Sequence, residues 1–187
     1  MRLGVLVSGR GSNLEAILDA GLPVALVVSN RFGVRALDVA AAHGVPATCL
    51  RRSDHADASA RDAAIGAALA KAGVELAVLA GWDQVLRPSY FAAFGGRTIN
   101  VHPSLLPAHG GPGMMGLDVH RSVLEGGDSE TGVTIHDVTA ELDAGPILAQ
   151  ASVPVRPDDD PETLAARVLA EEHRLLVATI RALGAGA

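Results

Sequence analysis

The sequence predicts an α/β fold in which a mainly parallel, twisted sheet carries helices on both faces. Of the 187 residues, 49% are hydrophobic but only 3% are aromatic. Ala, Val and Leu must therefore form the core, which suits buried parallel strands. Short apolar runs also alternate with helical stretches through the first half of the chain, the order that produces parallel sheets. The pattern changes in the last third, where two longer strands flank a tight turn and are expected to be partly antiparallel.

Five apolar runs bounded by turn residues supply the expected strands of the first half. They are residues 3–7, 23–28, 48–50, 76–80 and 98–102. The helices expected between them show apolar residues at helical spacing, and most of them stop at a glycine. They are a helix capped by Ser12 or Asn13 and ended by Gly21, helices over 36–43 and 58–72, and a short helix that begins at Pro88.

The remaining chain begins with a loop over residues 105–116 that is rich in Gly and Pro. A short helix is expected over 119–125, strands over 131–138 and 147–155, and a long final helix over 162–183. We see neither an internal repeat nor a linker. The sequence is therefore expected to form a single domain spanning residues 1–187.

Charge and composition exclude several classes of function. The formal charge is −6, from 21 acidic and 15 basic residues, and no basic run provides a surface for nucleic acid. We find neither a signal peptide nor an apolar run long enough to cross a membrane. The single cysteine, Cys49, lacks an adjacent base and is interpreted as a buried structural thiol rather than a nucleophile. We expect a cytoplasmic protein with small-molecule partners, either a monomer or a homodimer, that binds neither nucleic acid nor membranes.

The loop Ser8–Asn13 lies between the first strand and the first helix. Its glycines allow close backbone approach, and the start of the helix presents unpaired N–H groups to an anion. It lacks the Lys-Ser/Thr ending of a Walker A loop, and Leu14 occupies the position of the third glycine in a dinucleotide fingerprint. The loop is therefore either a phosphate site or simply a tight connection.

Asn100 and His102 lie two residues apart at the end of the fifth expected strand. Residues at this spacing face the same side of a strand, and its carboxyl end is where open α/β sheets bind ligands. An amide that stabilises an oxyanion and an imidazole that moves a proton suit acyl transfer to an amine. By itself, however, a histidine at a strand end is more often a structural residue.

Three segments carry a family resemblance over nearly the whole chain. They are Gly9-Arg10-Gly11-Ser12-Asn13, Asn100-Val101-His102-Pro103-Ser104-Leu105-Leu106-Pro107 and Glu141-Leu142-Asp143-Ala144-Gly145-Pro146-Ile147. Together they resemble the glycinamide ribonucleotide formyltransferases of purine synthesis. The resemblance implies a Rossmann-like formyltransferase fold and 10-formyltetrahydrofolate as co-substrate, without a metal.

The resemblance also implies residue roles. Asn100, His102 and Asp143 match the catalytic residues, and we call them the catalytic trio. The residues matching the substrate-binding positions are Gly11, Ser12 and Asn13 at the phosphate and Glu172 at the ribose. Those matching the folate site are Trp82, Asp83, Gln84, Val85 and Leu86, together with Asn100 and Asp143. Asp143 is expected to orient His102 and to favour its charged form, which keeps a proton available at neutral pH.

The chain departs from the family pattern in two places. Asp83-Gln84 stands where many family members carry an apolar residue followed by Arg, so a difference in the charge of the folate pocket is expected. The stretch 108–116 is longer than the shortest family versions, and it is either a lid or a tolerated surface insertion. Trp82 could line a pocket or pack in the core, and Glu172 without the resemblance would be an ordinary helix acid.

Other assignments are disfavoured. His102, His109, His120 and His136 lack the spacing of a zinc-binding motif, and His136 is interpreted as a structural residue or as support for the site. A hydrolase releasing formate from the same folate would be expected to carry an extra N-terminal domain. A tRNA-directed formyltransferase would be expected to carry a basic C-terminal domain. A binding module with a decayed site is disfavoured by the intact trio.

Overall fold

The computed structural model describes residues 1–186. By its internal contacts the chain divides into two compact units, the first over Met1–Ile99 and the second from Asn100 onwards. The boundary lies inside strand β5 (Arg97–His102). The expectation of a single domain over residues 1–187 stays a prediction, and residue 187 lies outside the described residues.

The described residues contain one sheet of seven strands in the order β3-β2-β1-β4-β5-β6-β7. Besides β5 these are β1 (Leu3–Val7), β2 (Val24–Ser29), β3 (Ala47–Cys49), β4 (Leu76–Leu79), β6 (Glu130–Asp137) and β7 (Ile147–Pro154). Strand β1 pairs in parallel with both β2 and β4, and β2 pairs in parallel with β3. Strands β6 and β7 are antiparallel, with Val133 opposite Ala151. The predicted fold class, a mainly parallel sheet with antiparallel final strands, is confirmed.

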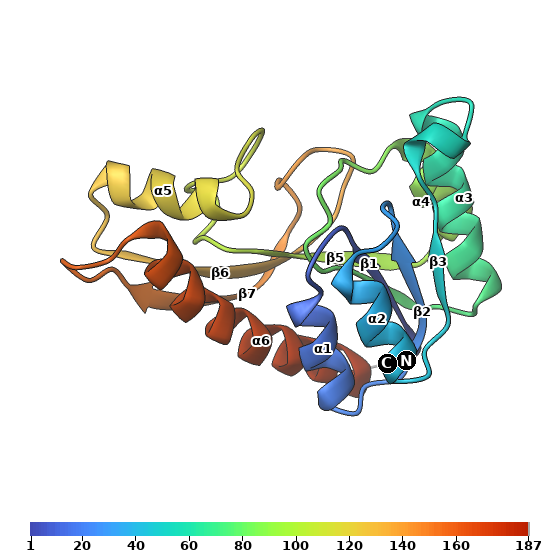
Figure 1. The fold of residues 1–187 in the computed structure, drawn as a ribbon, viewed down its shortest axis with the longest axis horizontal. Helices are drawn as coiled ribbons and strands as arrows, with labels where there is room; N and C mark the ends of the chain where they lie inside the picture. Colours follow the sequence, from blue (N-terminus) through green and yellow to red (C-terminus); the bar gives the residue numbers. More distant parts are fainter. Residues whose placement is uncertain (187) are drawn as a thin grey trace. The chain divides into compact units, whose positions relative to one another are not determined.

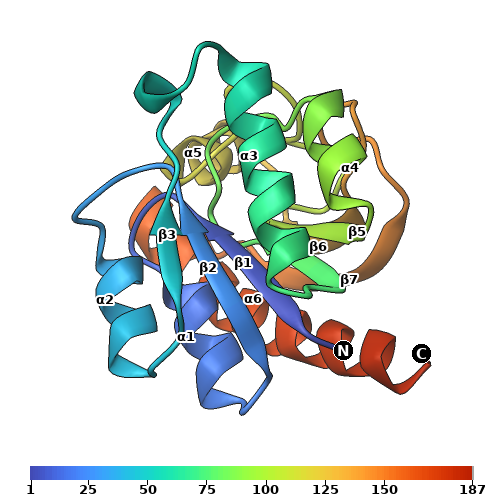
Figure 2. The ribbon, with the colours of Figure 1, turned by 90° about the vertical axis from the view of Figure 1, so that its right-hand side faces the viewer.

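The first unit is a layered α/β structure. Its helices are α1 (Ser12–Asp19), α2 (Arg35–Ala42), α3 (Ala58–Lys71) and α4 (Pro88–Phe94), with a 3₁₀ turn η1 (Arg52–Asp54). Helices α1 and α2 contact each other on one face of the strands, and α3 and α4 contact each other on the opposite face (Figures 1 and 2). Strand β1 is buried along its whole length, as expected for a strand with helices on both faces.

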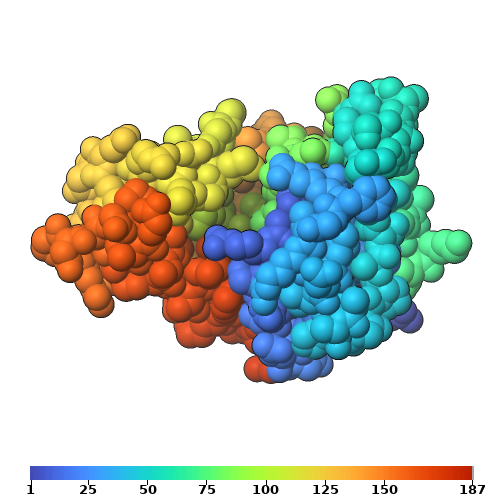
Figure 3. Space-filling view, viewed as in Figure 1, coloured from blue at the N-terminus to red at the C-terminus, as the bar shows by residue number. Residues whose placement is uncertain are grey.

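The second unit is built around the β6–β7 hairpin. Its helices are α5 (Leu117–Gly126) and α6 (Pro161–Ala185), and α6 contacts β6, β7 and α5 (Figure 1). The two helices lie next to each other on the surface of this unit (Figure 3). Asp160 begins α6 with a capping box, accepting a hydrogen bond from the Thr163 N–H. That signal fixes the start of the long helix as the sequence predicted.

The expected elements are all present, with boundaries shifted by one or two residues. One local prediction was wrong: neither Ser12 nor Asn13 caps α1, because Gly11 occupies the N-cap position in a left-handed conformation with φ 77°. None of the helices within residues 1–186 combines the length and the apolar character needed to span a membrane.

Candidate active site

The segment that follows β5 is anchored to the β6–β7 hairpin by one hydroxyl group. Thr134 Oγ1 donates to the Ser104 carbonyl at 2.7 Å and accepts from the Leu106 N–H at 3.0 Å. The Gln150 amide donates both to Thr134 Oγ1 and to the Leu106 carbonyl. Ser104 Oγ also closes the turn by donating to the Ala108 carbonyl. These bonds fix the chain directly after His102.

His102 is buried, with 4% of its surface exposed, and its two ring nitrogens have different surroundings. Nε2 lies 2.9 Å from the His109 carbonyl oxygen, and Nδ1 lies 3.9 Å from Asp143 Oδ2. A carbonyl oxygen only accepts hydrogen bonds, so Nε2 must carry the proton in the neutral ring. The lone pair of the neutral imidazole is therefore on Nδ1, the nitrogen that faces the Asp143 carboxylate.

Asp143 adopts a left-handed backbone conformation, with φ 52°. Its Oδ2 accepts a 3.0 Å hydrogen bond from the Gly111 N–H, and its Oδ1 lies 3.7 Å from His136 Nε2. A positive φ at a residue other than glycine costs free energy and persists only where the surroundings enforce it. The carboxylate is thus held between two histidines by its turn and by the 108–116 loop.

His136 fixes the orientation of the Asn100 amide. Its Nδ1 lies 2.9 Å from the Asp137 carbonyl oxygen, which only accepts, so Nδ1 carries the proton and Nε2 is an acceptor. Asn100 Nδ2 lies 3.1 Å from that Nε2 and donates to it. The second N–H of the amide can serve another acceptor. These contacts favour the interpretation of His136 as a residue that supports the site.

Burial lowers the pKa of His102, and this effect is larger than the opposing effects of the His109 carbonyl and the Asp143 carboxylate. The expectation that His102 is held in its charged form is therefore wrong for the ligand-free protein. Removing an imidazole from water penalises the imidazolium form, and a carboxylate at 3.9 Å does not compensate. Burial therefore favours the neutral form of His102.

The protein should lose stability on acidification below pH ~6.5, the ordinary pKa of histidine. Burial lowers the pKa of both His102 and His120, so the unfolded state binds more protons between the folded and unfolded pKa values. As the pH is lowered through that window, the free energy of unfolding decreases by at most about 1.4 kcal/mol per pH unit for each histidine. Urea titrations from pH 7.5 to 5 measure this slope.

Two variants separate the contributions to this slope. His120→Gln should flatten the pH dependence. His43→Gln should instead change the slope above pH ~6.5, because a hydrogen bond to the Val39 carbonyl raises the pKa of His43, and the stability this provides is lost as the pH rises through the raised pKa. An unchanged slope in His120→Gln would contradict the assignment.

The first loop of the chain is tightly packed within the first unit. A Cβ on Gly11 would lie 2.7 Å from Ala36 Cβ and 2.8 Å from Ala36 Cα. The Gly9 carbonyl accepts from the Ala36 N–H, which ties the loop to the start of α2. Ser12 and Asn13 form the first turn of α1, at the positive end of the helix dipole. A helix N-terminus favours an anion, and the assignment of Gly11, Ser12 and Asn13 to a phosphate stays a prediction.

The residues expected at the folate site differ in their exposure. Trp82 and Leu86 are buried, and the Arg61 guanidinium lies 5.7 Å from the centre of the Trp82 ring. Of the two interpretations of Trp82, the structure favours the packed indole. Gln84 and Val85 are exposed.

The Asp83 carboxylate connects its own loop to the two loops of the first unit that contain Ser8 and Asn30. Its Oδ1 accepts from Ser8 Oγ at 3.0 Å and from Asn30 Nδ2 at 2.7 Å, and its Oδ2 is bonded by Arg31. The Asp83 N–H also donates to Ser8 Oγ. Ser8 and Asn30 are more than 90% buried. The departure from the family pattern at this position therefore has a structural role.

The Asp83→Ala substitution should lower the free energy of unfolding by about 2–3 kcal/mol, because it leaves the buried Ser8 and Asn30 side chains without their charged acceptor. Chemical denaturation measures the change. Asp118→Ala is a suitable control, because its ion pair with Arg121 lies on the exposed face of α5 and such pairs contribute little. Equal effects of the two substitutions would show that the Asp83 contacts are not stabilising.

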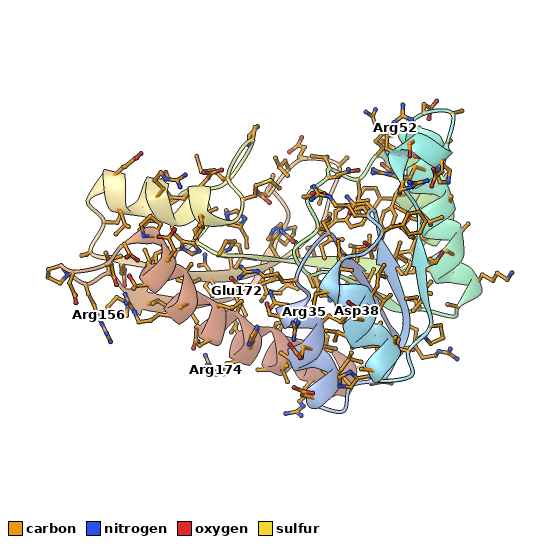
Figure 4. The ribbon with its side chains drawn as sticks, in the orientation of Figure 1. Arg35, Asp38, Arg52, Arg156, Glu172 and Arg174 are labelled. Carbon is orange, nitrogen blue, oxygen red and sulfur yellow. The ribbon has the colours of Figure 1, made fainter. Side chains whose placement is uncertain are left out.

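Glu172 is buried on α6, with 9% of its surface exposed. Figure 4 shows it on the opposite side of the helix from Arg174, which is exposed and pairs with Glu171. Glu172 is thus not an ordinary exposed helix acid.

Two other expectations concern metals and thiols. Within residues 1–186, no group of three or more His, Cys, Asp or Glu side chains is arranged to hold a metal ion. The absence of a metal from the reaction stays a prediction.

Cys49 is half-buried, and burial raises the pKa of its thiol, which makes it a poor nucleophile.

His109 and Gly111 were not predicted to be parts of the site. Both belong to the 108–116 loop, which was expected to be either a lid or an insertion. Their contributions come from a backbone carbonyl and a backbone N–H, and these groups leave no signature in a sequence. The loop is more than a surface insertion, because it contacts both His102 and Asp143.

The profile of the formyl transferase family matches residues 1–180. This chain belongs to the formyl transferase family. Within it, phosphoribosylglycinamide formyltransferase of Mycobacterium tuberculosis strain H37Rv is 45% identical over 186 residues, covering 97% of this chain and 84% of that protein.

A solved structure shows the same fold. Glycinamide ribonucleotide transformylase 1 from Symbiobacterium toebii superposes with a TM-score of 0.93 at 41% identity, covering 100% of this chain and 88% of that chain. The trifunctional purine biosynthetic protein adenosine-3 of Drosophila melanogaster is 40% identical over 92% of this chain. The chain spans only 13% of the length of that fly protein.

Proposed function

We propose that this chain transfers a formyl group from 10-formyltetrahydrofolate to the amine of glycinamide ribonucleotide, a step of de novo purine biosynthesis. Membership of the formyl transferase family supports formyl transfer, and the names of the relatives support the acceptor. The observation that carries the proposal is the grouping of Asn100, His102 and Asp143 in the second unit.

The side chains of this group fit the reaction. Acyl transfer to an amine requires a donor for the developing oxyanion and a group that carries one proton from the attacking nitrogen to the departing nitrogen. Asn100 has an N–H available beyond the one bonded to His136. His102 has an unprotonated nitrogen directed at a carboxylate.

The first step forms the new C–N bond. The acceptor amine attacks the formyl carbon, and the electrons of the carbonyl double bond move to oxygen. Asn100 Nδ2 donates a hydrogen bond to the resulting oxyanion. His102 Nδ1 takes the proton released by the amine, and Asp143 stabilises the imidazolium that forms.

The second step breaks the bond to the folate. His102 returns its proton to N10 of the folate, directly or through water, as the carbonyl re-forms and tetrahydrofolate leaves. The products are the formylated amide and tetrahydrofolate, with no covalent enzyme intermediate. His102 carries the extra proton only between the two steps. A pKa of His102 below its ordinary value in the free protein is therefore compatible with turnover.

The remaining site residues hold the substrates in this proposal. Gly11, Ser12 and Asn13 bind the phosphate through backbone N–H groups, and Glu172 accepts hydrogen bonds from the ribose hydroxyls. The segment 82–86 is assigned to the folate, and within it Gln84 and Val85 are the exposed residues that can contact a ligand directly. In this proposal the reaction uses no metal. The protein acts in the cytoplasm, and it is either a monomer or a homodimer.

The test is to incubate the purified protein with glycinamide ribonucleotide and 10-formyltetrahydrofolate while recording the folate absorbance. We expect an absorbance change that requires both substrates. An unchanged spectrum with authentic substrates would overturn the proposal. A change that proceeds equally without the ribonucleotide would instead identify a hydrolase.

A further inference from the structure

A second group of polar side chains in the second unit has no part in the proposed reaction. His109 Nδ1 lies 2.8 Å from Ser122 Oγ, and His109 Nε2 lies 2.6 Å from Asp128 Oδ2. Ser122 belongs to α5, and Asp128 lies between α5 and β6. The imidazole therefore connects the 108–116 loop to a helix and to the turn that follows it.

The backbone of His109 is in an unfavourable conformation. Its φ is 53°, and among the described residues only His109 and Asp143 combine a positive φ with a side chain. Such residues persist where other contacts enforce them, and they concentrate at functional sites. The contacts to Ser122 and Asp128 supply that enforcement for His109.

The backbone of residues 109–111 forms hydrogen bonds to both ionisable members of the catalytic trio, His102 and Asp143. The His109 carbonyl accepts from His102 Nε2, and two residues later the Gly111 N–H donates to Asp143 Oδ2. Because both bonds come from one stretch of backbone, the position of residues 109–111 sets the separation of His102 Nδ1 from Asp143 Oδ2. It also keeps the proton of neutral His102 on Nε2.

We propose that Ser122, His109 and Asp128 form a clamp that positions residues 109–111, and through them His102 and Asp143, for formyl transfer. This inference rests on the proposed function, which it deepens by naming three positioning residues. The clamp acts through backbone groups, so none of its side chains needs to touch the substrates.

The order Ser–His–Asp also occurs in serine hydrolases, but Ser122 lies in the middle of α5. Backbone N–H groups in the middle of a helix bond within that helix, so those beside Ser122 cannot form an oxyanion hole. The geometry supports positioning rather than a nucleophile.

His109→Gly tests the clamp, because glycine adopts a positive φ without strain while the imidazole is lost. We expect kcat to fall about 10- to 100-fold, the range for a misplaced catalytic group. The KM for glycinamide ribonucleotide should stay within about twofold. Ser122→Ala is a milder second variant, and Asp128→Asn, which keeps an oxygen acceptor for Nε2–H, should restore much of the activity lost in Asp128→Ala.

A spectroscopic measurement tests the clamp without relying on turnover. In protein labelled with ¹⁵N-histidine, His102 should give the signals of a ring protonated only at Nε2 at pH 7.5. In His109→Gly these signals should shift toward a mixture of tautomers. His43→Ala is the matched control, since His43 also bonds a backbone carbonyl and an aspartate but lies in the first unit.

The outcomes separate the two proposals. Inactive wild-type protein would overturn the proposed function, and the His102 signals would still test the clamp. Active wild type together with His109→Gly at wild-type kcat and with unchanged His102 signals would overturn the clamp.

Discussion

The His102→Ala variant is expected to lose formyl transfer, with kcat reduced by about 10²- to 10⁴-fold, the usual contribution of a positioned acid–base group. The reason is the position of Nδ1, which holds the lone pair of a buried neutral ring and faces the Asp143 carboxylate at 3.9 Å. Alanine offers no group that can carry the proton between the two nitrogens. The absorbance assay with both substrates measures the loss.

Binding and turnover should separate in this variant. Calorimetric titration with glycinamide ribonucleotide should show an affinity close to that of wild type, because the phosphate and ribose contacts are assigned to other residues. His43→Ala provides a control for general effects of removing a histidine. A His102→Ala enzyme within tenfold of wild-type kcat would reject His102 as the proton carrier.

Gly145→Ala should have the second largest effect. A Cβ at this position would lie 1.8 Å from the Asp137 carbonyl oxygen, and the Asp137 N–H is bonded to the Pro146 carbonyl. The turn must therefore move to admit one methyl group, and Asp143 must move with it. We expect kcat to fall about 100-fold and the free energy of unfolding to fall by about 1–3 kcal/mol.

Activity and chemical denaturation of the same preparation measure these two changes. Gly186→Ala is the control, because apart from the adjoining residues the nearest atom to a Cβ there would be the Ala182 carbonyl oxygen at 3.9 Å. Wild-type kcat in Gly145→Ala would show that the Asp143 carboxylate tolerates displacement, and would weaken its assignment to the reaction.

The sequence predicted the fold well because its signals are local. Apolar runs alternate with amphipathic helices, and glycines such as Gly73 and Gly95 follow the helices they end. The spacing of Asn100 and His102 also predicted their common side of β5. The proximity of Asp143 came from the family resemblance, because it depends on a turn more than 40 residues away in the chain.

The electrostatic state of the site was harder to predict. The expected charged form of His102 assumed that the Asp143 carboxylate dominates, whereas burial has the larger effect on its pKa. Which ring nitrogen carries the proton depends on the His109 carbonyl, and the orientation of the Asn100 amide depends on His136. Backbone carbonyls and degrees of burial arise only from the tertiary structure.

Asp83, in the first unit, is another residue whose role could not be predicted from the sequence. From the sequence it was a departure from the family pattern with a possible effect on the charge of the folate pocket. In the structure its carboxylate is already bonded by Ser8, Asn30 and Arg31. These partners lie on loops that come together only in the folded chain, so the sequence alone does not indicate them.

The most direct measurement follows the formyl carbon itself. Folate carrying a ¹³C-labelled formyl group is mixed with glycinamide ribonucleotide and enzyme, and the carbon is observed by NMR. We expect the label to pass to the amide of the ribonucleotide, with one tetrahydrofolate formed for each amide. Label recovered as free formate, or retained on the folate, would contradict it.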